Sequence, residues 1–204
     1  MHRLVLATRN AGKIAEFRRI FEEIAPGSIE LVGLAQFPDL EDVEETGLTF
    51  QENALLKARA VCHVTGLPTI ADDSGLSIDA LSGSPGILSA RFSGAHGNDS
   101  TNIAKVLAEL GDLPRSSRGA HFTCVTALVM PDGSQVTQEA ILTGEILTEP
   151  IGKNGFGYDP IFLPAGRKLS LAQMDSASKD AISHRGQSLR AIAPEVASML
   201  GALG

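Results

Sequence analysis

Tryptophan is absent from this 204-residue sequence, and aromatic residues make up only 4% of it. Proteins that bind long single-stranded nucleic acids usually stack the bases on aromatic side chains, and nucleic-acid binders in general show a basic stripe. Here Lys and Arg are scattered singly, and the formal net charge is -7. We therefore expect no nucleic-acid partner, and a core built from Leu, Ile, Val and Ala.

Cysteines are also few, and long apolar runs are missing. Cys62 and Cys124 stand far apart without CxxC spacing, which argues against a disulfide framework or a zinc site and favours small core residues. No apolar run approaches the ~20 residues that span a bilayer. The run after Met1 is too short for a signal peptide. We expect no membrane partner and a cytoplasmic protein.

The overall balance is that of an ordinary globular protein, with 43% hydrophobic and 20% charged residues. Apolar periodicity predicts an α/β fold: a mixed, twisted central sheet flanked by helices, within one domain spanning 1–204. Pro131-Asp132-Gly133 predicts a hairpin. The expected strands are 3–7, 29–33, 68–71, 76–81, 120–130, 135–147 and 160–163; the expected helices are 12–24, 49–64, 98–110 and 187–200.

A polar hexapeptide separates the first expected strand from the first expected helix. Its residues are Thr8, Arg9, Asn10, Ala11, Gly12 and Lys13. Backbone amides at a helix N-terminus favour phosphate, and the Thr, Asn and Lys side chains add donors and a charge. The pattern GxxxxGK[ST] is not satisfied, so the segment is not a Walker loop. It is either a phosphate site or only a capped helix with a surface lysine.

Two adjacent carboxylates, Asp72 and Asp73, follow the apolar run 68–71 and precede Ser74-Gly75. Acidic side chains at the carboxyl end of a strand lie where α/β proteins bind ligands. If the strand stays extended, the two side chains point to opposite sides, so one can hold Mg²⁺ while the other orients or deprotonates water. The alternative is an Asp-rich turn without a catalytic role.

A second acidic pair, Glu44 and Glu45, precedes a helix that Thr49 and Glu52 open with a capping-box pattern. Lys57 lies four residues after Asn53 and so shares a helix face with it. A carboxylate of this pair would complete a metal site with the aspartates, and Lys57 would balance it or touch phosphate. The alternative is a solvated acidic loop.

Two segments near the C-terminus carry candidate nucleoside contacts. In Gly155–Pro160 the glycines allow close approach to a flat ligand, and Phe156 is placed to stack on a base. In 178–186, which we expect to be a loop, donors are available to the oxygens of a purine. The alternatives are an aromatic lid on the core and surface ion pairs. The candidate residues are Phe156, Gly157, Tyr158, Asp159, Lys179, His184 and Arg185.

Together these segments closely resemble the Ham1/RdgB-type family of inosine-triphosphate pyrophosphatases. The matching pieces occur in the family's order and span most of the chain: LATRNAGK (6–13), EETGLTFQENALLKA (44–58), IADDSGL (70–76), PGILSARFSG (85–94), GFGYDPIF (155–162) and SHRGQ (183–187). Segments 26–43, 111–119 and 164–177 match nothing specific.

The resemblance implies Mg²⁺-dependent hydrolysis of ITP, dITP or XTP to the monophosphate and pyrophosphate, by a homodimer with two lobes around a central cleft. Asp73 would be the proton acceptor and would bind metal with Glu44 or Glu45; Asp72 and Lys13 would assist catalysis. Thr8 to Lys13 and Lys57 would bind the triphosphate. Ser74 would contact substrate, and the seven residues named above would hold the nucleoside.

Two other functions remain open at this point. One is a Maf-type pyrophosphatase for modified pyrimidine nucleotides, which a substrate panel separates from the first reading. The other is a nucleotide sensor without turnover. The Asp72-Asp73 pair argues against a sensor, because two nearby carboxylates do not help to bind a triphosphate unless a metal is present.

Overall fold

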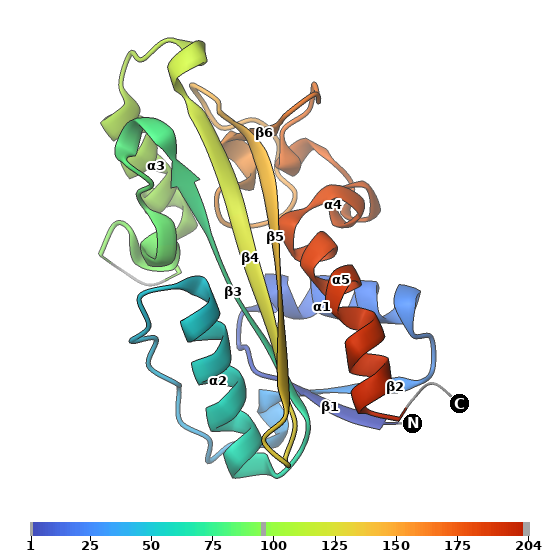
Figure 1. Ribbon diagram of the computed structural model, residues 1–204. Coiled ribbons are helices and arrows are strands. Elements are labelled where there is room, and N and C mark those ends of the chain that lie inside the picture. The colour runs from blue at the N-terminus through green and yellow to red at the C-terminus, as the bar shows by residue number, and fades with distance from the viewer. Residues whose placement is uncertain (1, 95–96, 202–204) are drawn as a thin grey trace. The chain divides into compact units, whose positions relative to one another are not determined.

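The computed structural model describes residues 2–94 and 97–201, and it has the α/β architecture that the sequence predicts (Figure 1). One mixed six-stranded sheet runs in the order β2-β1-β3-β4-β5-β6. Its strands are β1 His2–Leu6, β2 Ile29–Gly33, β3 Thr69–Ile78, β4 Gly119–Val129, β5 Gln135–Ile146 and β6 Phe162–Pro164. The helices are α1 Ala11–Ile24, α2 Phe50–Thr65, α3 Asp99–Leu110, α4 Ser176–Ile182 and α5 His184–Met199.

The chain divides into two compact units, as the expectation of two lobes requires. Unit 1 comprises Met1–Asp73, Cys124–Ala140 and Arg185–Gly204, and unit 2 comprises Ser74–Thr123 and Ile141–His184. The divisions fall inside β3, β4 and β5, so each of these strands contributes residues to both units.

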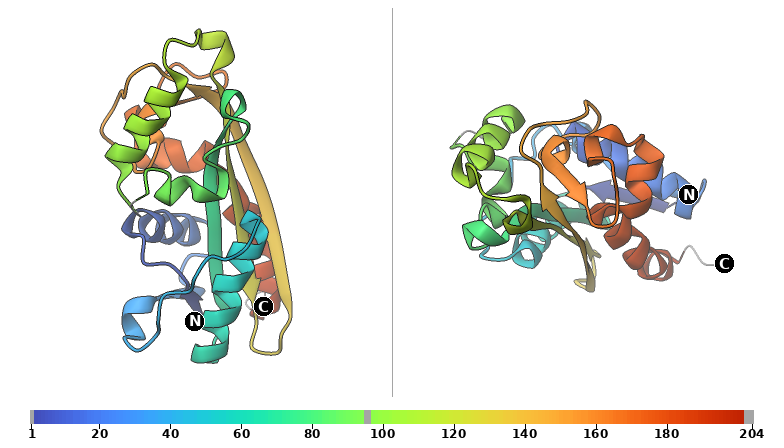
Figure 2. Two further views of the ribbon diagram at one scale, coloured as in Figure 1. Left: turned by 90° about the vertical axis from the view of Figure 1, so that its left-hand side faces the viewer. Right: turned by 90° about the horizontal axis from the view of Figure 1, so that it is seen from above.

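Unit 1 has three layers, because successive residues of a strand point to opposite faces of the sheet. Val5 and Ala71 pack with α2 on one face, whereas Leu6 and Ile70 pack with α1 and α5 on the other (Figures 1 and 2). β1 runs parallel to both β2 and β3. Cys62 and Cys124 are buried and free, as expected.

Unit 2 is built around a second apolar cluster. Leu76 and Ile78 of β3 pack there with Val106 of α3 and Phe162 of β6. β6 pairs antiparallel with β5, so Ile146 lies opposite Phe162. The cluster also includes Tyr158, which ties the glycine-rich segment before β6 to the core of the unit.

The sequence-based boundaries are wrong in five places. Two concern the expected strands 76–81 and 160–163, because Asp79–Leu81 and Asp159–Ile161 form short 3-10 helices. The other three concern β3, α4 and α5. β3 does not end before Asp72 but continues to Ile78; its register with β1 covers Thr69 and Ile70, and β4 is its neighbour on the other side of the sheet, so tertiary pairing overrides the turn preference of Asp-Asp-Ser-Gly. The segment expected to be a loop contains α4, whose first turn is capped by Asp175, which accepts from the Ser178 N–H at 2.8 Å. α5 begins at His184 rather than Gln187.

No helix among residues 2–94 and 97–201 is long and apolar enough to cross a membrane.

Candidate active site

The alternation of β3 places its two aspartates in different surroundings. Asp72 continues the face of Ile70, which α1 and α5 cover, and Asp73 continues the face of Ala71, which α2 covers. Both side chains are at least nine-tenths buried, with relative exposures of 1% and 6%. The prediction that the two carboxylates point to opposite sides is therefore confirmed.

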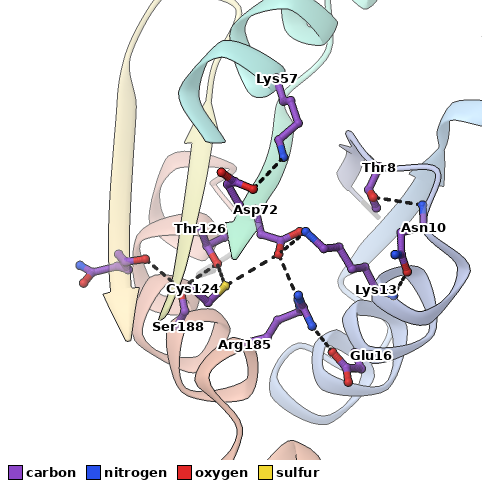
Figure 3. Close-up of polar contacts among 12 residues, drawn as sticks. Thr8, Asn10, Lys13, Glu16, Lys57, Asp72, Cys124, Thr126, Arg185 and Ser188 are labelled. Carbon is purple, nitrogen blue, oxygen red and sulfur yellow. Dashed lines mark hydrogen bonds and ion pairs between the residues drawn. The ribbon is translucent and has the colours of Figure 1, made fainter. Parts of the chain in front are cut away.

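Asp72 is surrounded by cations from the two helices on its face (Figure 3). Its Oδ2 lies 2.9 Å from Lys13 Nζ of α1 and 3.1 Å from Arg185 Nε of α5. Burial by itself would raise the pKa of Asp72, but Lys13 and Arg185 hold that pKa far below its usual range. Asp72 is thus an ionised carboxylate whose charge is already compensated.

Arg185 is held in turn by a second carboxylate. Its Nη1 forms a buried salt bridge with Glu16 of α1, three residues after Lys13 on the same helix (Figure 3). Burial would lower the pKa of Arg185, but Asp72 and Glu16 raise it. The thiol of Cys124 also faces Asp72 at 3.8 Å, and burial together with that carboxylate raises the pKa of Cys124 to about 12. A buried thiol with a raised pKa is poorly suited to act as a nucleophile.

Asp73 has the opposite electrostatic character. Lys57 Nζ of α2 lies 3.6 Å from its Oδ1. Burial raises the pKa of Asp73 above its usual range, and the nearby charges of Lys57 and Lys13 offset this only in part. A carboxylate with a raised pKa is a better proton acceptor than an ordinary aspartate.

Glu45 is brought into the same cluster by Lys57, whose Nζ lies 2.5 Å from Glu45 Oε1. Burial would lower the pKa of Lys57, but Asp73 and Glu45 raise it. One turn earlier on α2, Asn53 Oδ1 accepts from the Gly47 N–H at 2.8 Å. Asn53 and Lys57 thus share a helix face, as predicted, and together hold the segment that carries Glu45. Glu44 is exposed.

The hexapeptide before α1 is ordered by its own side chains. The backbone N–H of Lys13 donates to Asn10 Oδ1 at 3.0 Å, and the N–H of Asn10 donates to Thr8 Oγ1 at 3.2 Å (Figure 3). Ala11 and Gly12 form the first turn of α1. Arg9 instead bonds to Asp42 and to the Leu40 carbonyl, each at 2.7 Å. The capped N-terminus that sequence predicts is confirmed.

In unit 2 the glycine-rich segment forms a compact aromatic site. Asp159 makes a buried salt bridge with Lys179 of α4 and accepts from the Phe156 N–H at 2.9 Å. Lys179 Nζ lies 4.7 Å from the centre of the Phe156 ring, a cation–π distance. A Cβ at Gly155, whose φ is +75°, would meet Asp159 Oδ2 at 2.0 Å, so only glycine fits there.

Three further candidate residues, His184, Ser74 and Tyr158, are buried or half-buried. His184 is buried in unit 2 and stacks on Phe122, with ring centroids 4.6 Å apart. Ser74 is half-buried in β3. Tyr158 is buried, and its hydroxyl donates to the Ser89 carbonyl at 2.8 Å.

The residues of unit 1 fit a hard divalent cation. Among the described residues, no three or more His, Cys, Asp or Glu side chains are arranged as a ready-made metal cage. Mg²⁺ does not need one, because it commonly binds one or two carboxylates together with waters and substrate phosphates. Asp73 and Glu45 share Lys57 as a partner, and burial together with the charges of Glu45 and Asp72 raises the pKa of Asp73, so an added cation would stabilise its ionised form.

Sequence reasoning missed Glu16, which is 3% exposed although it is charged. The available signal was its spacing on α1: it follows Lys13 by three residues and precedes Phe17 and Ile20 of the apolar stripe. A glutamate on the buried side of a helix needs a cationic partner. Only the structure identifies that partner as Arg185, which lies 169 residues away along the chain.

Comparison with known proteins identifies the family and the fold. A family model described as "Ham1 family" matches residues 4–195. A dITP/XTP pyrophosphatase of Streptomyces avermitilis is 51% identical, covering 98% of this chain and 100% of the relative. The solved structure of a HAM1 protein from Coxiella burnetii matches with a TM-score of 0.85 at 41% identity, covering 97% of this chain and 100% of that one. The Ham1 protein of Staphylococcus aureus matches with a TM-score of 0.83 at 38% identity, covering 97% and 99%.

Proposed function

The chain belongs to the Ham1 family, and we propose that it is a pyrophosphatase that hydrolyses non-canonical purine nucleoside triphosphates such as ITP, dITP and XTP. The products are the nucleoside monophosphate and pyrophosphate, so the enzyme removes abnormal purines from the nucleotide pool. The relative of Streptomyces avermitilis carries the name of this activity, at 51% identity over nearly the whole chain.

The observation that best supports a hydrolase is the contrast between the adjacent aspartates. Lys13 and Arg185 keep Asp72 ionised and compensated, whereas burial raises the pKa of Asp73. Pairs of titratable groups whose surroundings drive their pKa values apart are typical of acid–base sites. A simple nucleotide sensor has no need of such a pair, and we therefore favour the enzyme.

In the proposed reaction, water attacks the α-phosphorus and pyrophosphate leaves. Asp73 orients this water and accepts its proton. Lys13 and the amides of the first turn of α1 stabilise negative charge on the departing phosphates. Asp72 holds Lys13 in place through their 2.9 Å ion pair. Thr8, Asn10 and Lys57 contribute further phosphate contacts.

We propose Mg²⁺ as the cofactor, held by Glu45 and Asp73. Their shared partner Lys57 supports Glu45 over the exposed Glu44 as the second ligand. When bound, Mg²⁺ supplies charge neutralisation at the phosphates and lowers the pKa of coordinated water. Asp72, whose charge is already offset by two cations, is a weaker candidate ligand.

For the nucleoside we propose a site in unit 2. Phe156 stacks on the base, with the neighbouring Gly157, Tyr158 and Asp159 shaping its surroundings. Donors from Lys179 and His184 suit the oxygen at C6 of hypoxanthine and xanthine, where adenine carries an amino group. Polar groups left unsatisfied by the wrong base give strong discrimination. A further contact from Arg185 stays a prediction, since its guanidinium already binds Asp72 and Glu16.

Three further points rest on the family resemblance. We propose that residues 1–204 act as one catalytic domain, that the protein works as a homodimer, and that it acts in the cytoplasm on free nucleotides. The division of β3, β4 and β5 between both units supports a single domain.

The test is pyrophosphate release from purified protein with dITP, ITP, XTP, GTP and ATP, each with and without Mg²⁺. We expect Mg²⁺-dependent release from the first three and little from GTP or ATP. A parallel panel of modified pyrimidine triphosphates tests the Maf-type alternative. Tight binding without release from any nucleotide would instead favour a sensor.

A further inference from the structure

Both peptide groups that flank Phe156 are bound by carboxylates. Its own N–H donates to Asp159 Oδ2 at 2.9 Å, and the N–H of Gly157, the next peptide, donates to Asp99 Oδ2 at 2.6 Å. These two bonds restrict the backbone torsions on either side of the Phe156 Cα, and they therefore limit the directions in which its ring can point.

The two carboxylates differ in origin. Asp159 belongs to the same turn, is buried, and forms the salt bridge with Lys179. Asp99 is exposed, lies 58 residues away along the chain, and is the first residue of α3. α3 is anchored in the core of unit 2 by Ile103 and Val106. Asp99 thus connects the turn that carries Phe156 to a helix that is packed into the core of unit 2.

The bond to Asp99 adds to a longer one within the turn, in which the N–H of Asp159 donates to the Phe156 carbonyl at 3.3 Å. Gly157 has a φ of +60°, and glycine reaches many backbone conformations at little cost. At 2.6 Å the bond from Gly157 to Asp99 is shorter than that turn bond, so it contributes to holding this peptide in place. A second observation places the Asp99 charge beside the turn: burial raises the pKa of Tyr158, and Asp99 raises it further.

We infer that Asp99 is a positioning residue for purine recognition, which fixes the Gly157 peptide so that Phe156 is held in the orientation that stacks on the base. The inference rests on the proposed role of Phe156 in binding the nucleoside. Stacking on a base is made equally in the ground state and the transition state, so its loss raises KM and leaves kcat nearly unchanged.

The test compares three variants. Asp99→Ala removes the acceptor and the charge, while Asp99→Asn removes the charge but keeps an oxygen that accepts from Gly157. A double variant, Asp99→Ala with Ser100→Asp, restores a negative charge in the first turn of α3 without restoring the bond. It therefore controls for the favourable effect of an acidic residue at a helix N-terminus.

Two readouts are needed, and one does not depend on activity. Amide hydrogen exchange of Gly157, followed by NMR, measures the bond directly; KM and kcat for dITP measure its use. For Asp99→Ala and for the double variant we expect Gly157 exchange to be faster and KM to rise about fivefold, as for the loss of one hydrogen bond, with kcat within about twofold. Asp99→Asn should retain most of both properties.

Three outcomes would overturn the inference. Recovery of the wild-type KM in the double variant would show that Asp99 acts only through its negative charge at the start of α3, and not through its bond to Gly157. An unchanged KM in Asp99→Ala, while Phe156→Ala raises KM, would reject Asp99 alone and leave the proposed function standing. Failure of the wild-type protein to hydrolyse dITP, ITP or XTP would reject the proposed function, and the inference with it, whatever the Gly157 exchange rate.

Discussion

The two units each contain a buried charge cluster, and the clusters differ in composition. In unit 1 the carboxylate cluster consists of Glu16, Glu45, Asp72 and Asp73 with Lys13, Lys57 and Arg185, which is four acids against three bases. In unit 2 the aromatic cluster consists of the buried pair Asp159 and Lys179 beside the ring of Phe156, and the exposed Asp99 binds the next peptide.

The difference indicates two kinds of chemistry. An excess of buried carboxylate is unfavourable unless a proton or a cation compensates it, so the carboxylate cluster suits proton transfer and a divalent metal. A balanced pair beside an aromatic ring has no such need and suits recognition of a flat polar ligand. Perturbing the first cluster should therefore affect kcat and stability, and perturbing the second should affect KM and selectivity.

The largest effect should come from Asp73→Asn. It keeps the size of the side chain but removes the proton acceptor and a charged ligand of Mg²⁺, so at saturating Mg²⁺ and substrate kcat for dITP should fall by about 10²–10⁴-fold. Pyrophosphate release under saturating substrate measures this. Circular dichroism of the variant controls for folding, and full turnover by a folded variant would rule out the assigned role.

For the free energy of unfolding, we expect the larger loss from Asp72→Asn rather than from Asp73→Asn. Asp72→Asn breaks a buried, compensated pair and should lower the free energy of unfolding by about 3–5 kcal/mol at pH 7. Asp73→Asn removes a carboxylate that is costly to bury and should be neutral or stabilising in metal-free protein. Urea denaturation of both variants measures the difference, and equal destabilisation would contradict it.

These effects should also depend on pH with opposite signs. The pKa of Asp72 is lowered on folding, so its stabilising contribution is present at neutral pH and is lost as the pH falls below about 4. The pKa of Asp73 is raised on folding, so its ionisation lowers stability as the pH rises above about 4. The destabilisation caused by Asp72→Asn should therefore shrink in acid.

A smaller effect is expected in the aromatic cluster. Phe156→Ala should raise KM for dITP about tenfold, the typical loss for one stacked base, with a smaller change in kcat. Phe92→Ala provides a matched control, because Phe92 also lies under a lysine, with Lys105 Nζ 4.1 Å from its ring centre. Its loss should leave KM unchanged. A fall in kcat alone for Phe156→Ala would contradict the assignment of binding to the aromatic cluster and catalysis to the carboxylate cluster.

The smallest effect should be on selectivity. His184→Ala should relax the preference for ITP over ATP by a few-fold, because one donor to the base oxygen is lost. The ratio of kcat/KM for the two nucleotides measures this. His184→Ala also removes the stacking on Phe122. The companion variant His184→Gln loses this stacking but keeps a donor, so it separates the two effects. An unchanged ratio in His184→Ala would remove this residue from base recognition.

Much of the fold could be predicted because its signals are local. Apolar periodicity located four of the five α-helices in the described part of the chain, and Pro131-Asp132-Gly133 located the hairpin between β4 and β5. Asn10 and Thr49 cap α1 and α2 as their residue types suggest. The missed helix, α4, has only seven residues, too few for a clear periodic pattern. The strand through Asp72-Asp73-Ser74-Gly75 was missed because its place beside β4 in the sheet, rather than its composition, keeps it extended.

By itself, the sequence determined the α/β class, the family resemblance and the residue types available for chemistry. It also determined that adjacent aspartates on an extended strand must face opposite ways, since that follows from backbone geometry. Only the tertiary structure decided what each aspartate meets. Lys13 and Arg185 reach Asp72 from opposite ends of the chain and lower its pKa, whereas Lys57 reaches Asp73 from α2 and offsets only in part the rise in pKa that burial causes. Such contacts depend on how the helices pack on the sheet, which no local sequence pattern specifies.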